Sequence, residues 1–120
     1  MRFYWATLQV RNLDASVHFY QDIVGLSVQR RFLSRPGVEI CFLGDGETQV
    51  ELIHDAGKSG YVMGNGITLG FEAGTLEAKM AFIKQHGLIV ESGPFWPNEH
   101  VGFFYVLDPD GVRVQFVENR

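Results

Sequence analysis

The segments "FLGDGETQVELI" (residues 42–53) and "YVLDPDGVRVQFV" (residues 105–117) look like one β-hairpin written twice. Each has an apolar strand, a turn rich in Asp and Gly, and a return strand that alternates polar and apolar residues. At matching places the return strands carry Glu51 in the first copy and Gln115 in the second. A chain with such a repeat is expected to fold as two similar modules, neither of which can bury its sheet face alone.

The repeat extends beyond the hairpins. A shift of 61 residues lays "WATLQV" (residues 5–10) on "GITLGF" (residues 66–71), and a shift of 64 residues lays Glu51 on Gln115. The first alignment pairs Trp5 with Gly66. These two pairs of aligned segments, which we call the anchors of the repeat, predict that each module begins with a strand and ends with one.

A helix is predicted between the anchors of each module. The first spans residues 13–25, with Asp14 as its N-cap and Gly25 as its stop, and the second runs from Thr75 to Gly87. The apolar residues of each helix recur at helical spacing and are expected to face the sheet. They are Leu13, Val17, Tyr20 and Val24 in the first helix, and Leu76, Met80 and Ile83 in the second.

Three strand-like runs follow each helix, at residues 26–33, 38–44 and 48–54, and then at 88–92, 102–107 and 112–118. The order β-α-β-β-β therefore occurs twice, at about residues 1–56 and 64–120, within one expected domain of 120 residues. This pattern predicts the α+β class.

Composition limits the partners of the chain. A net charge of −4 without a basic run gives no basic surface for nucleic acid or an anionic membrane. The N-terminal segment "MRFYWATLQV" alternates and reads neither as a signal peptide nor as a membrane span. The single Cys41 favours a reducing compartment and is expected to be a buried, unactivated thiol. We therefore expect a cytoplasmic protein.

The paired modules, the helix sequence "NLDASVHFYQDIVGL" and the turn of "DPDGVRVQFVE" resemble the vicinal oxygen chelate superfamily over essentially the whole chain. That superfamily includes glyoxalase I, extradiol dioxygenases and bleomycin-type drug-binding proteins. The resemblance implies a curved mixed sheet in the shape of a cup, with the helices outside. It leaves the reaction open, because function depends on the site and not on the scaffold.

The resemblance also implies four metal-ligand positions, one at the start and one on the last strand of each module. Glyoxalase-like members carry His or Gln and then Glu at these positions, whereas this chain carries Trp5, Glu51, Gly66 and Gln115. An indole and a glycine supply no side-chain ligand to a catalytic ion, and one carboxylate with one amide is a poor set. We therefore expect no cofactor. A divalent metal at Glu51 and Gln115 is the less favoured alternative.

The remaining residues of the expected cavity are mainly aromatic and uncharged. Trp5 and Trp96, together with Phe103 or Phe104, are predicted to line it, and Gly66 is predicted to leave space. Such a lining suits a planar or aromatic ligand, with Glu51 and Gln115 fixing its polar edges.

Two classes of function remain open. The first is a homodimeric protein that binds a small molecule without a metal, in sequestration or resistance. The second is a lyase, isomerase or dioxygenase of the superfamily, which is either metal-dependent or uses Glu51 and His100 as catalytic residues. His100 is a candidate because it follows Glu99 in an aromatic loop just before a strand.

Overall fold

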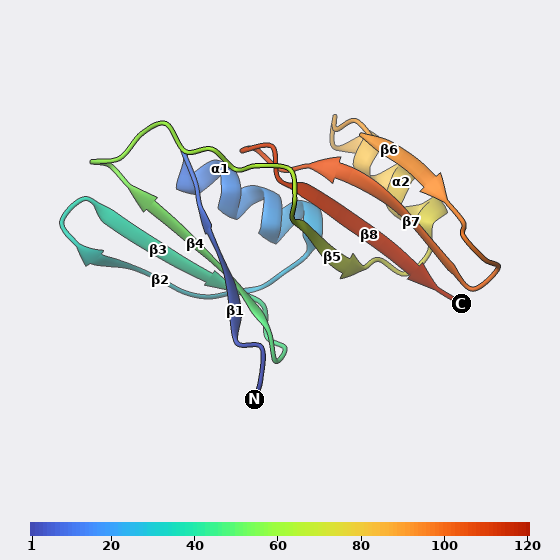
Figure 1. The fold of residues 1–120 in the computed structure, drawn as a ribbon, viewed down its shortest axis with the longest axis horizontal. Coiled ribbons are helices and arrows are strands. Elements are labelled where there is room, and N and C mark those ends of the chain that lie inside the picture. Colours follow the sequence, from blue (N-terminus) through green and yellow to red (C-terminus); the bar gives the residue numbers. More distant parts are fainter. The chain divides into compact units, whose positions relative to one another are not determined.

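The computed structural model describes all residues 1–120, which separate into two compact modules, residues 1–62 and 63–120. Each module has the predicted order of one strand, one helix and three strands (Figure 1). The α+β class and the two β-α-β-β-β repeats are therefore confirmed. That the two sheets curve into one cup stays a prediction. Neither helix is long and apolar enough to cross a membrane.

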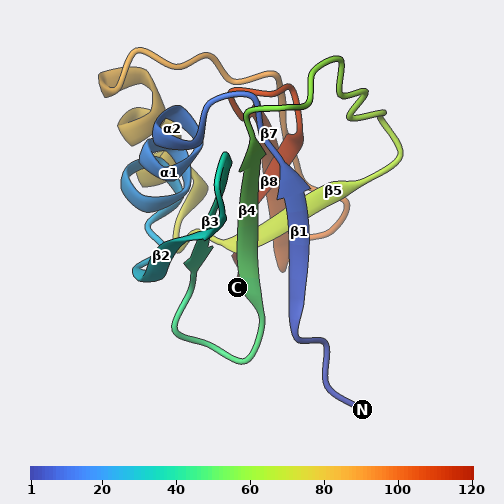
Figure 2. The same cartoon turned by 90° about the vertical axis from the view of Figure 1, so that its left-hand side faces the viewer.

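The first module contains β1 (Trp5–Gln9), β2 (Val28–Arg35), β3 (Val38–Leu43) and β4 (Gln49–Asp55). Its sheet has the order β1-β4-β3-β2, with β1 parallel to β4 and the other pairs antiparallel. Helix α1 (Leu13–His18) and the π-helical segment η1 (Phe19–Val24) lie on one side of this sheet (Figure 2).

The second module repeats this arrangement. Its strands are β5 (Thr68–Glu72), β6 (Ser92–Phe95), β7 (Val101–Leu107) and β8 (Arg113–Asn119), in the order β5-β8-β7-β6. Strand β5 is parallel to β8, and the other pairs are antiparallel. Helix α2 (Leu76–Gln85) contacts the two middle strands, β7 and β8.

The helices end as the sequence predicts, but the first begins differently. Gly25 ends the first helical region with a φ of 98°, and Gly87 follows the second with a φ of 72°. Thr75 caps α2, because its side chain accepts a hydrogen bond from the Ala78 amide. The N-cap of α1 is Asn12, whose side chain accepts from the Ala15 amide, so the assignment to Asp14 was wrong.

One strand was predicted in the wrong place. The apolar run at 88–92 resembles a strand, yet β6 occupies Ser92–Phe95. The Leu88 amide bonds to the Ile83 carbonyl, so this run begins by closing the end of α2. Pro94 is tolerated in β6 because an edge strand needs hydrogen-bond donors on only one side.

In both modules the strands alternate between a face that packs on the helix and an opposite face, which we call the open face. In the first module Cys41 pairs with Leu52 in register, both are fully buried, and the neighbouring Arg31 reaches Asp14 of α1. In the second module Glu118 accepts a hydrogen bond from the Leu76 amide of α2. Glu51 and Gln115 have the opposite parity in their strands and therefore lie on the open faces.

Candidate functional site

Glu51 is a buried carboxylate on the open face of the first sheet. Only 8% of its surface is exposed. The parallel register of β1 and β4 places Thr7 beside it, and the Thr7 hydroxyl donates a hydrogen bond of 2.6 Å to Glu51 Oε1. This contact fixes one carboxylate oxygen as an acceptor and leaves Oε2 for another donor.

An aromatic wall stands next to this carboxylate. Phe42 lies opposite Glu51 in the antiparallel register of β3 and β4 and is 3% exposed. The ring of Trp5 meets that of Phe42 edge-on at a centroid distance of 5.1 Å. The Arg30 guanidinium covers the Phe42 ring at 4.3 Å, and Phe32 stacks on Phe42 at 6.4 Å.

Sequence reasoning identified Trp5 and Glu51 as residues of one cavity but missed Phe42 and Arg30. Phe42 could have been found from its place in the predicted strand, because it lies in the first hairpin opposite the Glu51 strand. Arg30 carried no such signal. The edge strand β2 contains a register shift between Val28 and Arg30, which changes the pairing of the residues that follow it.

Gln115 occupies the equivalent place on the open face of the second sheet. Its amide nitrogen donates to the Tyr105 hydroxyl at 3.1 Å, and the Arg113 guanidinium covers the Tyr105 ring at 3.9 Å. Phe103 packs against Tyr105 at 5.7 Å, and Phe95 against Phe103 at 5.8 Å. Gln115 and Phe103, both predicted to bind the ligand, therefore share one aromatic face.

The sheet register corrects the predicted pairing of Trp5 with Gly66. Strand β1 aligns Thr7 with Glu51, and β5 aligns Gly70 with Gln115. The structural counterpart of Trp5 is therefore Thr68, because both lie two residues earlier on their strands. Gly66 lies two residues before the start of β5 and therefore has no partner on β8. The glycine beside Gln115 is Gly70, where an added Cβ would lie 3.3 Å from Gln115 Oε1, and a role of Gly66 in leaving space for a ligand stays a prediction.

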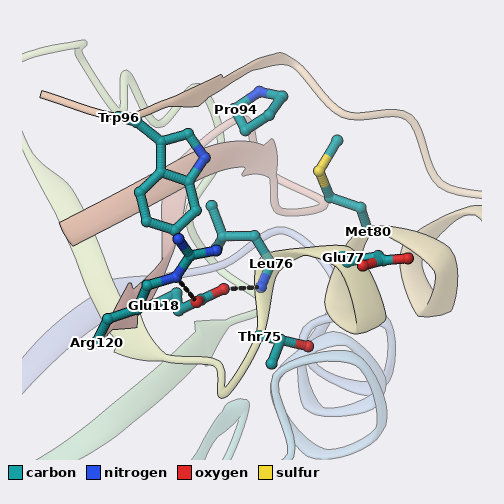
Figure 3. A pocket seen from close by; sticks show the side chains of 8 residues that line it. All are labelled: Thr75, Leu76, Glu77, Met80, Pro94, Trp96, Glu118 and Arg120. Carbon is teal, nitrogen blue, oxygen red and sulfur yellow. Dashed lines mark hydrogen bonds and ion pairs between the residues drawn. The ribbon is translucent and has the colours of Figure 1, made fainter. Parts of the chain in front are cut away.

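Phe104 and Trp96 do not share the open face with Gln115. Phe104 is fully buried and packs on Phe116 at 5.4 Å, within the core beneath α2. Trp96 covers Gly102 on the same helix-facing side and lines a separate pocket with residues of α2 (Figure 3). Of the two alternatives Phe103 and Phe104, Phe103 is therefore the one on the face of Gln115, and the prediction that Trp96 lines the same cavity was wrong. Strand alternation places Phe103 and Phe104 on opposite faces.

The histidines have local partners. His100 is exposed in the loop before β7 and lies 3.5 Å from Glu99, also exposed. His18 pairs with Asp22 at 2.6 Å, and His54 and His86 each bond to a backbone carbonyl. A catalytic role for His100 stays a prediction. The Cys41 thiol is fully buried, as expected, and burial raises its pKa, which opposes reactivity at neutral pH.

The donors present do not fit a transition-metal site. No three His, Cys, Asp or Glu side chains cluster anywhere in the chain. On the first open face Glu51 is accompanied by a threonine hydroxyl and an indole, and on the second Gln115 is accompanied by a tyrosine hydroxyl. Catalytic zinc requires several imidazole, thiolate or carboxylate ligands. Neither face supplies an imidazole or a second carboxylate beside Glu51 or Gln115.

Comparison with known proteins places this arrangement in a family. A family model described as the Glyoxalase/Bleomycin resistance protein/Dioxygenase superfamily matches residues 2–116. A lactoylglutathione lyase from Neisseria meningitidis is 29% identical over 128 residues, covering 100% of this chain and 92% of that protein. A lactoylglutathione lyase from Haemophilus influenzae is 32% identical over 124 residues, covering 94% and 89%.

Solved structures of glyoxalases share the fold. A trypanothione-dependent glyoxalase I from Leishmania major superposes with a TM-score of 0.83 at 22% identity, covering 98% of this chain and 86% of that one. A glyoxalase I mutant from Zea mays superposes with a TM-score of 0.84 at 25% identity. That match covers 97% of this chain but 44% of the maize protein.

Proposed function

Because this chain belongs to the Glyoxalase/Bleomycin resistance protein/Dioxygenase superfamily, we propose that it binds a small planar molecule on the open face of its first sheet, without a metal ion. One observation carries the proposal. The buried Glu51 carboxylate, held at one oxygen by Thr7, stands beside the Trp5 and Phe42 rings. Aromatic walls with one oriented polar group are typical of sites that bind planar ligands.

The polar groups of this face define the ligand chemistry. Glu51 Oε1 already accepts a hydrogen bond from Thr7, and Oε2 is left as an acceptor. An ionised carboxylate accepts hydrogen bonds and donates none, so the ligand must supply an N–H or O–H group. A planar ligand that carries N–H groups, such as an amidine, can meet Oε2 while its ring contacts Trp5. An anionic head group beside Oε2 is disfavoured by repulsion from Glu51, whereas the positive charge of this face, Arg30, lies over the Phe42 ring.

Benzamidine and benzoate test this proposal, because they share a ring and a planar head group but differ in charge and in N–H content. The chain has two tryptophans, so the indole N–H signals of ¹⁵N-labelled protein separate Trp5 from Trp96. We expect benzamidine to shift the Trp5 signal saturably, and benzoate to leave it unchanged. Glu51→Gln should weaken benzamidine at least about tenfold, the effect of losing one charged hydrogen bond. Equal binding by Glu51→Gln, or no saturable Trp5 shift, contradicts the proposal.

The names of the relatives favour a second candidate, a lactoylglutathione lyase activity. In that case Glu51 would act as the base, with His100 as the other predicted catalytic residue. The assay is lactoylglutathione lyase turnover with and without added Zn²⁺ or Ni²⁺. Turnover that Glu51→Gln abolishes and the control Glu47→Gln retains would replace the binding proposal with the enzymatic one.

We also propose a homodimer in the cytoplasm. The edge strand β2 is solvent-exposed along most of its length, with Leu33 at 70% and Phe32 at 38% exposure. Open sheet edges with exposed apolar residues favour pairing with a second copy. Light scattering should give twice the monomer mass.

The buried free thiol of Cys41 supports the proposed cytoplasmic location, because free thiols persist in reducing compartments.

A further inference from the structure

A cavity of about 450 Å³ lies on the helix-facing side of the second module, away from the open face described above. It opens between the first turns of α2 and the segment that leaves β6, and β8 closes its floor (Figure 3). Its volume falls within the usual range for small-molecule sites. The residues that line it are Thr75, Leu76, Glu77, Met80, Pro94, Trp96, Glu118 and Arg120.

The indole of Trp96 is clamped in this cavity. One ring face rests on Gly102, where an added Cβ would lie 2.5 Å from the indole carbons. The Arg120 guanidinium covers the ring at 4.2 Å from its centroid. A glycine inside a strand weakens the strand, so its presence here marks a close approach of another group. The tryptophan is therefore pre-organised, with its edge and not its faces available to a ligand.

The available edge carries a hydrogen-bond donor. Figure 3 shows the indole nitrogen of Trp96 on the side of the ring that faces Pro94 and Met80 across the cavity, and no protein group accepts its hydrogen. Arg120 uses its Nε to bind Glu118 at 2.6 Å, which leaves the terminal nitrogens as further donors. Leu76, Met80 and Pro94 supply apolar surface between these donors and the helix.

Two of the three side chains that could accept a hydrogen bond in the cavity, Glu118 and Thr75, are already engaged, and the third is Glu77. Glu118 accepts from the Leu76 amide at 2.7 Å with Oε1 and from Arg120 with Oε2. The Thr75 hydroxyl accepts from the Ala78 amide. The side of the cavity formed by Trp96 and Arg120 therefore offers donors to a ligand and needs an acceptor in return. Two carboxylates and one guanidinium line it, so the summed charge is negative and a ligand carboxylate would be repelled.

We propose that this cavity is a second binding site, specific for a small neutral molecule that carries a carbonyl group on an apolar or aromatic body. The carbonyl oxygen accepts from the Trp96 indole N–H and from an Arg120 terminal nitrogen. The apolar body packs on Leu76, Met80 and Pro94. The site is independent of the one proposed on the first module, because its ligand chemistry is the reverse: here the protein donates, and there Glu51 accepts.

Acetophenone, benzoate and benzylamine are matched probes for this site, as a neutral carbonyl compound without N–H groups, an anion and a cation on the same ring. We expect acetophenone to move the Trp96 indole proton downfield in a saturable way, with a Kd of about 1 mM or lower. The Trp5 signal should stay in place, because acetophenone has no N–H to offer Glu51. Benzoate should bind at least about tenfold more weakly because the summed charge repels it, and benzylamine because its ammonium accepts no hydrogen bond. Acetophenone binding that shifts only Trp5, or benzoate binding as tightly as acetophenone, overturns the proposal.

Two variants separate a specific site from unspecific ring contact. Trp96→Phe keeps an aromatic ring but removes the N–H, and should weaken acetophenone at least about tenfold, as followed by saturation transfer to the ligand. Arg120→Gln should weaken it less, because one donor of two is altered. Arg35→Gln, which alters an exposed arginine of the first module outside both proposed sites, is the control and should leave acetophenone affinity unchanged. If Trp96→Phe fails to fold, the wild-type ranking of the three probes and the Arg120→Gln result still decide the proposal.

Discussion

Thr7 donates a hydrogen bond of 2.6 Å to Glu51 in the first module, whereas the equivalent residues of the second module, Gly70 and Gln115, form no such bond. Gln115 binds the hydroxyl of Tyr105 instead, and the counterpart of Tyr105 in the first module is Phe42. The hydroxyl that orients the polar residue therefore comes from the outer strand in one module and from the middle strand in the other. Each module keeps one oriented polar group on its open face.

Thr7→Val should release the Glu51 carboxylate while preserving side-chain shape. The loss of one hydrogen bond to a charged group should cost about 1.5–3 kcal/mol of unfolding free energy, at the low end here because Thr7 is exposed. Urea unfolding measures this change. Thr7→Ser retains the hydroxyl and should remain close to the wild type. Equal destabilisation by both variants would show that the methyl group, and not the hydrogen bond, matters.

Trp5→Ala should remove the aromatic wall beside Glu51. We expect the affinity for benzamidine to fall by about 1–3 kcal/mol, the usual scale for an aromatic contact. Calorimetric titration with benzamidine measures this loss of affinity. Trp5→Phe should recover part of the affinity because a smaller ring still reaches Phe42, whereas Trp96→Phe should not affect it. Unchanged affinity in Trp5→Ala would remove the open face of the first sheet as the binding site.

The purified protein should contain no stoichiometric Zn, Ni, Fe or Mn, because Glu51 and Gln115 lack the nitrogen or carboxylate partners that such ions need. Gln115→Glu alone should not create tight binding, since Trp5, Thr68 and Gly66 still offer no imidazole or carboxylate. Elemental analysis and Zn²⁺ titration test both statements. One ion per chain in the wild type, lost in Glu51→Ala, would establish the opposite.

Gly102→Ala should displace Trp96, because the new Cβ would lie 2.5 Å from the indole ring. Overpacking of this kind costs about 1–3 kcal/mol. Gly46→Ala is a matched control, since an added Cβ there meets nothing within 4 Å. Thermal unfolding should separate the two variants, and the Trp96 indole signal should shift only in Gly102→Ala. A fully stable Gly102→Ala with an unmoved indole would show that the ring has room to tilt.

Glu118 should make the second module sensitive to acid. The hydrogen bond from Arg120, followed by that from the Leu76 amide, lowers the pKa of Glu118 below its ordinary value of 4.5. A carboxylate with a depressed pKa in the folded state stabilises the protein above its unfolded pKa, and this contribution is lost as the pH falls through the folded pKa. The free energy of unfolding, measured from neutral pH into acid, should therefore fall less steeply in Glu118→Gln than in the wild type. The exposed Glu47→Gln should follow the wild-type curve.

Local patterns were sufficient for the repeat and for most of the secondary structure. The Asp-Gly turns and the alternating return strands placed Glu51 and Gln115 in equivalent positions, because a strand's side-chain period is fixed at two. Thr75, Gly25 and Gly87 marked helix boundaries for an equally local reason, since a cap depends on a few neighbouring backbone groups. The same reasoning failed for most of residues 88–92, because the Leu88 amide closes the end of α2, Ile89 is 83% exposed and β6 begins only at Ser92.

The tertiary structure decided which residues share each face of a sheet. The shift that aligns Trp5 with Gly66 is the best match of letters, but hydrogen bonding between β5 and β8 places Thr68 there instead. Phe103 and Phe104 are both plausible ligand contacts by type, and the register of β7 decides that only Phe103 lies beside Gln115. The Thr7–Glu51 bond and the clamp of Gly102, Trp96 and Arg120 join residues far apart in sequence. Pairing across strands, which creates such contacts, is fixed by the packing of the whole module and not by any short segment.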